Sequence, residues 1–236
     1  MGKIRFLFFA LPLLGASTVT AQELAVGVET GVTFSHLAAT PDAFRGSRVG
    51  YMVGASATLS LTSWVALQAG VRIEEKGAVI PDTFELRLRY LEFPVLVRLR
   101  IGGAAWPVRP LLMFGLEPAT ELSCALRYRS QVEGYPLGPW QSDNCVDDRT
   151  DLWDRGVIAG GGLEIRLGGV RAAMSAQSTI GTHNIASAYG CCSLENRATT
   201  IVFSIAVPLL GPRPPNPRQQ RTGAAPSRPT DARGVD

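Results

Sequence analysis

The sequence contains no apolar run long enough to cross a bilayer as a helix. A transmembrane helix needs about 20 consecutive apolar residues, whereas the apolar segment near the N-terminus, Ile4 to Leu14, is much shorter. This lack excludes helical membrane proteins. If the protein resides in a membrane, it must cross the membrane with strands.

The sequence also has little net charge. The formal charge is +3, and no long basic run with interleaved aromatic residues occurs. Nucleic-acid binding normally requires such a basic surface, so no nucleic-acid partner is expected. Hydrophobic residues make up 46% of the chain and charged residues 18%, with 25 glycines. This composition is apolar and glycine-rich for a soluble domain.

Residues suited to catalysis are scarce as well. The chain has two histidines, in the pairs Ser35-His36 and Thr182-His183. Adjacent residues in a strand point to opposite faces, which separates each hydroxyl from its imidazole. The triple glycine at 160–162 lies inside a strand pattern and opens no helix, so it is not a phosphate-binding loop. We therefore predict a protein that is not an enzyme, with no cofactor and no metal.

The two ends of the chain differ from its middle. Lys3 and Arg5, the apolar segment and the small residues before Gln22 are typical of a secretory signal peptide at 1–21. Residues 211–236 are rich in proline and arginine, which predicts a disordered periplasmic tail. The folded domain is therefore expected at 22–210, in an exported protein.

Eight segments of the middle region alternate apolar and polar residues with a period of two, which predicts strands. They are Leu24–Phe34, Val49–Leu61, Val65–Glu74, Glu85–Ile101, Val108–Cys124, Arg155–Leu167, Val170–Thr182 and Arg197–Leu209. Long connections at 35–47, 75–84, 125–154 and 183–196 alternate with short ones. These features predict an all-β fold, an eight-stranded antiparallel up-and-down transmembrane β-barrel in the bacterial outer membrane.

The charged residues fall on the face with small side chains, so we assign that face to the interior. An arginine facing lipid near the midplane costs roughly 2–4 kcal/mol, whereas inside a narrow barrel it can pair with a carboxylate. An eight-stranded barrel is just wide enough to be filled by side chains, so we expect a plugged interior. The predicted interior charge network consists of Glu29, Arg72, Glu92, Arg98, Arg100, Glu117, Glu164, Arg166 and Arg171.

The segment Glu85–Ile101 shows a change of phase. Its charges occupy odd positions before Tyr90 and even positions from Glu92 onward. If all of them point inward, one extra residue must be inserted near Tyr90–Glu92. A β-bulge supplies such a residue, and Pro94 suits an irregular position of this kind.

Four cysteines are expected at the rim that carries the long loops, and they are Cys124, Cys145, Cys191 and Cys192. An exported protein meets an oxidising periplasm, so we expect at least one disulfide that holds the long loop. Three pairings are possible. Zinc is an alternative, but the spacing from His183 to Cys191 fits no known zinc motif. The aspartates at 143–154 lack the spacing of a calcium loop.

Several segments together resemble a known family. GVTFSHL at 31–37, LQAGVRIEEKGA at 67–78 and YLEFPVLVRLRI at 90–101 are similar to the PorT-like outer-membrane β-barrel domain. The resemblance extends in order from Leu24 to Leu209, with Tyr90–Pro94 as its most distinctive part. It implies an outer-membrane barrel of Gram-negative bacteria, and it brings no catalytic constellation with it.

The function expected from these patterns is structural or interactive. We predict a monomer in outer-membrane lipid, with other envelope proteins meeting loop 125–154 or tail 211–236. A narrow pore or an accessory part of a transport or secretion system is the alternative. A soluble lipocalin-like periplasmic barrel is a further alternative, and it would place the apolar face inside.

Overall fold

The computed structural model describes residues 23–40, 46–103, 105–130, 137–144, 153–182 and 193–210. The expected signal peptide at 1–21 and tail at 211–236 lie outside these ranges. Among the described residues, no helix is long and apolar enough to cross a bilayer.

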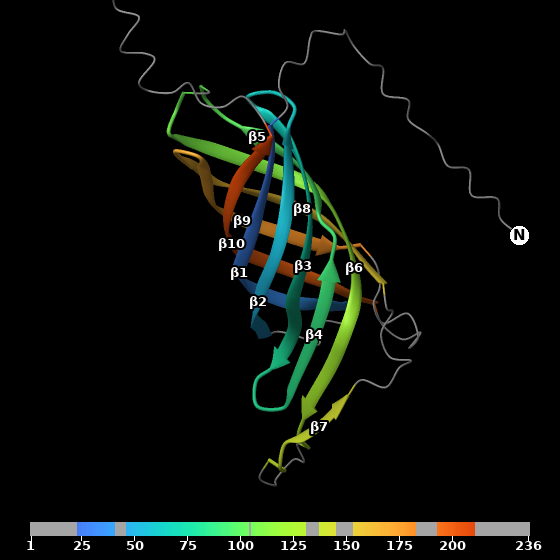
Figure 1. Cartoon of the computed structure of the whole chain (residues 1–236). Coiled ribbons are helices and arrows are strands. Elements are labelled where there is room, and N and C mark those ends of the chain that lie inside the picture. The colour runs from blue at the N-terminus through green and yellow to red at the C-terminus, as the bar shows by residue number, and fades with distance from the viewer. Residues whose placement is uncertain are drawn as a thin grey trace, which may run out of the picture.

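The described strands close into a ring. Going around it, β1 (Glu23–Thr40) pairs with β2 (Gly46–Ser60), which pairs with β3 (Val65–Ile80). β3 pairs with β4 (Phe84–Glu92) and β5 (Val95–Arg100), and both pair with β6 (Val108–Tyr128). The ring continues through β8 (Trp153–Leu167), β9 (Val170–Gly181) and β10 (Ser193–Leu210), and β10 returns to β1 (Figure 1).

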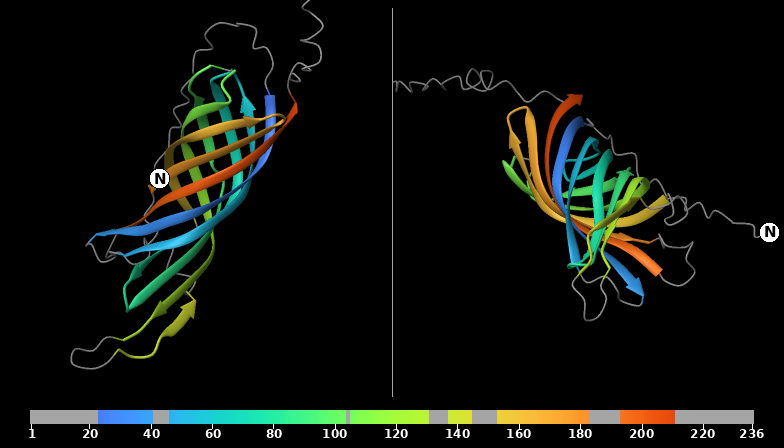
Figure 2. Two further views of the ribbon diagram at one scale, coloured as in Figure 1. Left: turned by 90° about the vertical axis from the view of Figure 1, so that its left-hand side faces the viewer. Right: turned by 90° about the horizontal axis from the view of Figure 1, so that it is seen from below.

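Every pairing in the ring is antiparallel. The short strand β7 (Gln141–Asn144) pairs with β6 beyond the ring, and β4 with β5 forms one interrupted strand. Ten strands minus β7, with β4 and β5 counted once, leave eight around the barrel. The predicted eight-stranded antiparallel barrel is therefore confirmed, and Figure 2 shows its tilted strands from two further directions.

The interruption between β4 and β5 lies at Phe93 and Pro94. Proline has no backbone N–H, so it cannot complete the ladder at this position. The remaining groups stay paired, because the Phe93 N–H donates to Pro118 at 2.9 Å and the Gly70 N–H donates to Pro94 at 3.0 Å. The break therefore leaves the barrel wall closed.

The predicted phase slip in Glu85–Ile101 is wrong. Even-numbered residues are buried all the way from Leu86 to Arg100, so one face points inward throughout. Arg87 and Arg89 point outward instead. The pattern of charges changes because toward the loops the interior becomes apolar and the outer wall becomes charged. A register irregularity does occur beside Tyr90, but the extra residue is on β6.

All four predicted long loops are shorter than expected. Within 35–47, β1 runs to Thr40 and β2 begins at Gly46, and within 183–196, β10 begins at Ser193. The segment 75–84 is mostly strand, since β3 runs to Ile80 and β4 begins at Phe84. A turn with Asp82 at φ 66° joins them, and the Thr83 N–H donates to the Ile80 carbonyl at 3.2 Å. Within 125–154, β6 continues to Tyr128 and β7 follows.

The outer wall is apolar and the interior is polar. Exposed side chains include Val28, Phe114 and Ile205, at 65%, 50% and 56%. The polar residues Glu92, Glu117 and Arg72 are 2% exposed or less. A lipocalin-like soluble barrel requires the reverse arrangement, so the structure overturns that alternative.

Close strand packing at Gly115 generates a test of the barrel wall. A Cβ at this position would lie 2.0 Å from the Val95 carbonyl oxygen, so Gly115→Ala must displace backbone. We expect a loss of roughly 1–3 kcal/mol in the free energy of unfolding, as for other overpacked positions. Urea titration in lipid vesicles measures it.

The matched control is Gly169→Ala in the β8–β9 turn, where no atom lies within 4 Å of the added Cβ. This variant should unfold at the urea concentration of the unmodified protein. Equal midpoints for the two variants would contradict the close packing at Gly115.

Candidate functional site: a charged cluster inside the barrel

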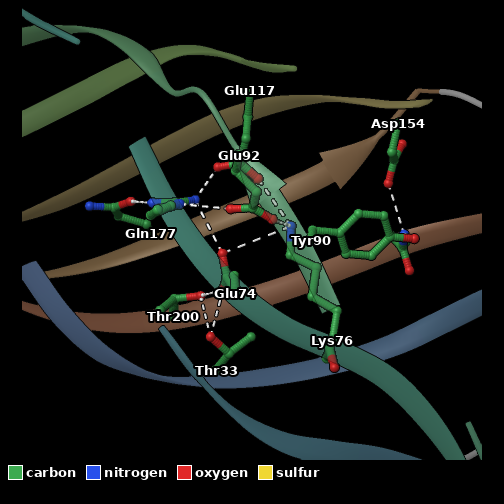
Figure 3. A network of polar contacts seen from close by, with 12 residues as sticks. Thr33, Glu74, Lys76, Tyr90, Glu92, Glu117, Asp154, Gln177 and Thr200 are labelled. Atoms are coloured by element: carbon green, nitrogen blue, oxygen red, sulfur yellow. Dashed lines mark hydrogen bonds and ion pairs between the residues drawn. The ribbon is translucent and has the colours of Figure 1, made fainter. Parts of the chain in front are cut away.

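Three strands bring five charged side chains together at the middle of the barrel interior. Arg72, Glu74 and Lys76 occupy alternate positions of β3 and therefore share its inward face. Glu92 ends β4 directly opposite Arg72, and Glu117 comes from β6. All five side chains are 4% exposed or less. We call these five residues the central cluster (Figure 3).

Arg72 is the donor that connects most of the central cluster. Its Nε lies 2.7 Å from Glu92 Oε2, and its Nη2 contacts Glu117 and lies 3.3 Å from Glu74 Oε2. Its Nη1 donates to Gln177 Oε1 on β9 at 3.0 Å. One guanidinium group therefore links β3, β4, β6 and β9 across the interior.

Lys76 binds the same carboxylates from the loop side. Its Nζ lies 2.6 Å from Glu92 Oε1, 3.0 Å from Glu117 Oε1 and 3.9 Å from Glu74 Oε2. The ammonium group also lies 5.8 Å from the centre of the Tyr90 ring. Such a desolvated cation is stabilised only when carboxylates and ring electrons surround it.

The carboxylates of the central cluster outnumber its cations by three to two. The hydroxyls of Thr33 and Thr200 compensate in part, because they donate to Glu74 Oε1 at 2.5 and 2.6 Å. Oxygens of Glu74, Glu92 and Glu117 lie within 4.8 Å of one another, which is close enough to hold a metal ion. Arg72 and Lys76 already bind these oxygens, so a metal ion would have to share them with the two cations.

A second group of charges fills the interior nearer the tight turns. Ser56 and Gln68 donate to Glu29 at 2.7 and 2.6 Å, and Gln68 accepts from Arg98 at 2.7 Å. Glu164 lies 3.0 Å from Arg100 and 3.6 Å from Arg98. Beyond them, Arg171 lies 2.6 Å from Glu23.

An apolar layer closes the interior on the loop side of the central cluster. Its buried members are Leu37, Ala78, Leu86, Leu88, Tyr90 and Ala119. The Asn196 side chain donates to the Tyr90 hydroxyl at 2.9 Å and to Asp154 at 2.8 Å, so the buried phenol is partnered. Charged and apolar layers together fill the barrel.

The structure places the predicted interior residues in three ways. Arg72, Glu92 and Glu117 belong to the central cluster, whereas Glu29, Arg98, Arg100, Glu164 and Arg171 lie nearer the tight turns. Arg166 is exposed at the end of β8. Sequence reasoning omitted Glu74 and Lys76, although the alternation that begins at Gln68 and Arg72 reaches both.

Of the four cysteines, only Cys124 is described. It lies on β6 against the apolar layer and is disulfide-bonded. Cys145, Cys191 and Cys192, and with them the pairing, lie outside the described residues. Ser35 is buried and bonds to Gly77, whereas His36 on the next position is exposed on the opposite face.

The central cluster generates a prediction about stability. Arg72→Met leaves three buried carboxylates without their main donor, so we expect the free energy of unfolding to fall by about 3–5 kcal/mol. Adding Glu117→Gln removes one of these charges and should restore part of the loss. Urea unfolding in lipid vesicles, followed by tryptophan fluorescence, measures both.

Arg197→Met is the control, because Arg197 is 47% exposed and lies 3.7 Å from Glu195. An exposed pair of this kind contributes less than about 1 kcal/mol. If the Arg72 and Arg197 variants lost equal stability, the cluster would have no special structural role.

Comparison with known proteins bears on the fold. The family description "Outer membrane protein beta-barrel domain" matches residues 20–187. Among solved structures, Neisserial surface protein A (NspA) is 11% identical with a TM-score of 0.46, over 78% of this chain and 97% of that chain. OprG from Pseudomonas aeruginosa is 11% identical with a TM-score of 0.44, over 82% and 98%.

Ail of Yersinia pestis is 9% identical with a TM-score of 0.43, over 79% of this chain and 99% of that chain. No curated protein matches the sequence. The family match covers most of the chain, including every strand from β1 to β9. This protein therefore belongs to the outer membrane protein β-barrel domain family.

Proposed function

We propose that this outer-membrane barrel is a non-catalytic interaction protein whose interior is a plug and whose loop end meets other envelope components. The observation that carries the proposal is the filled interior. Arg72 and Lys76 join the walls through buried contacts, and the apolar layer lies above them. Because the interior is blocked, only the outer surfaces of the barrel are available to contact other molecules.

The loop end provides a folded surface for such contacts. The β3–β4 hairpin, the end of β6 and β7 extend beyond the ring, and we call residues 79–86, 123–130 and 137–144 the extension (Figure 1). Arg129 lies 3.1 Å from Asp82, and its backbone N–H donates to Thr83 at 2.9 Å. The guanidinium groups of Arg127 and Arg129 lie 5.4 and 4.9 Å from the Trp140 ring centre.

The contacts within the extension support an interaction role because they hold an exposed surface in one shape. Trp140 remains 42% exposed beside the two arginines. Tryptophan and arginine are the residue types most enriched at the energetic centres of protein interfaces. We propose that the extension faces the cell exterior, as long loops do in outer-membrane barrels.

Within its family, we assign the chain to the PorT-like group. The segment Tyr90–Pro94 supports this assignment, because each distinctive residue in it has a structural task. Tyr90 anchors Asn196, Glu92 joins the central cluster and Pro94 interrupts the wall strand. We also propose that the protein is a monomer and that the disulfide from Cys124 holds the long loop.

Planar-bilayer recording tests the plug. The purified protein is expected to show no steady ion current, because ions would have to displace interlocked side chains. Gel mobility of boiled and unboiled samples verifies that the recorded protein is folded. A reproducible steady conductance from folded protein would instead favour the alternative, a narrow pore or a component of a transport or secretion system.

Photo-crosslinking in the native envelope tests the interaction role. A photoreactive amino acid replaces Ser142, which is exposed on β7, and in a control chain it replaces Thr62, which is exposed in the β2–β3 turn. We expect a discrete protein adduct from position 142 and none of the same mass from position 62. Absence of any protein adduct at position 142 would remove the extension as the interaction surface.

A further inference from the structure

Three arginines form a cluster on the outer wall near the loop end. Arg87 and Arg89 alternate with the buried residues Leu86, Leu88 and Tyr90 on β4, so they point away from the interior. Their side chains are 47% and 43% exposed. Arg127 on β6 lies opposite Glu85 and is 51% exposed. We call Arg87, Arg89 and Arg127 the outer arginines.

The outer arginines have loose ionic contacts. Arg87 lies 3.3 Å from Glu85 and 3.9 Å from Glu75, while Arg89 lies 3.7 Å from Glu75. Arg127 lies 3.7 Å from Glu85. Pairs in the central cluster are as close as 2.6 Å. Donors of the outer arginines therefore remain available to a ligand.

The charges around this cluster do not balance. Arg48 also contacts Glu75, at 2.7 Å, and Glu85, at 3.4 Å. Four arginines thus share two carboxylates, which leaves a surplus of two positive charges. Asp143 on β7, farther from the barrel, reduces the surplus to one. The arginines that contact Glu75 and Glu85 thus outnumber these carboxylates, even with Asp143 included.

The outer arginines lie at the edge of the apolar band. On the same face of the strand, the outward residues from Leu91 to Ile101 are all apolar. Ten residues at about 3.3 Å each, tilted by about 40°, rise roughly 25 Å, which is the height of the lipid-facing band of an outer-membrane barrel. On the outer face, Arg89 is the next residue beyond Leu91 toward the loops. It therefore lies at the level of the lipid headgroups.

We propose that the outer arginines bind the phosphate of an anionic lipid headgroup in the leaflet on the loop side. A guanidinium group presents paired N–H donors that match phosphate oxygens, and its weak hydration suits an interface. A hollow of about 380 Å³ offers space beside them, and its polar lining consists of Glu85, Arg87, Arg127, Ser142 and Asp143. Their height favours a lipid over a soluble anion, because lipid phosphates are concentrated at that level.

Native mass spectrometry of the full chain released from nanodiscs tests the proposal. The nanodiscs contain equal amounts of phosphatidylglycerol and phosphatidylcholine, and the ratio of the two lipids retained on the protein is measured. The unmodified protein should retain phosphatidylglycerol preferentially. Each basic side chain near an anionic surface contributes roughly a fivefold factor, so Arg87→Gln/Arg89→Gln should lower the ratio by roughly 25-fold.

The control Arg155→Gln/Arg197→Gln removes the same charge from the loop-side ends of β8 and β10, where both residues are exposed and point outward. This control should retain the lipid preference within about twofold. Equal losses in the two double variants would overturn the site in favour of general electrostatic attraction. Displacement of the lipid by millimolar inorganic phosphate would also overturn it, since the site would then bind a free anion. Boiled and unboiled gel mobility verifies that each variant folds.

Discussion

The absence of water from the hydrocarbon core of a membrane is the constraint on which this structure depends. Backbone groups that face lipid must be paired within the protein, so the sheet closes from β10 back to β1. Charged side chains are excluded from the lipid face for the same reason. They turn inward, where the central cluster pairs Arg72 and Lys76 with three glutamates. Closure and plugging thus have one physical cause.

The interior changes character along the barrel axis. Ion pairs near the tight turns give way to the central cluster and then to the apolar layer around Leu88 and Tyr90. The outer wall changes in the opposite sense, from apolar residues such as Val95 to the outer arginines. Both changes occur near the same level of β4, which in our proposal is where the strand leaves the membrane. Beyond it, water rather than lipid surrounds the wall, and charges are inexpensive outside.

These opposite changes of the interior and the outer wall explain which surfaces are available for function. The filled interior leaves the wall and the extension as the parts that can meet other molecules. The wall contacts lipid through its apolar band and, in our proposal, through arginines at headgroup level. The extension combines Trp140 with Arg127 and Arg129 in a shape held by its own contacts. Lipid attachment near its base would keep the extension at a constant height above the membrane.

The alternation of residues was enough to identify the eight strands, most of their inward faces and most of the buried charges, because a period of two is a local property of a strand. Alternation alone was enough to place Glu29, Arg72 and Glu117 on one face. Only the tertiary structure decided which charges meet and where the membrane ends. Arg87 and Arg98 carry the same charge on one long segment, yet the first faces outward and the second inward. Their odd and even positions already put them on opposite faces, and it was the shared charge that wrongly suggested an inward position for both. That the outer wall becomes charged at the height of Arg87 follows only from the pairing of the neighbouring strands.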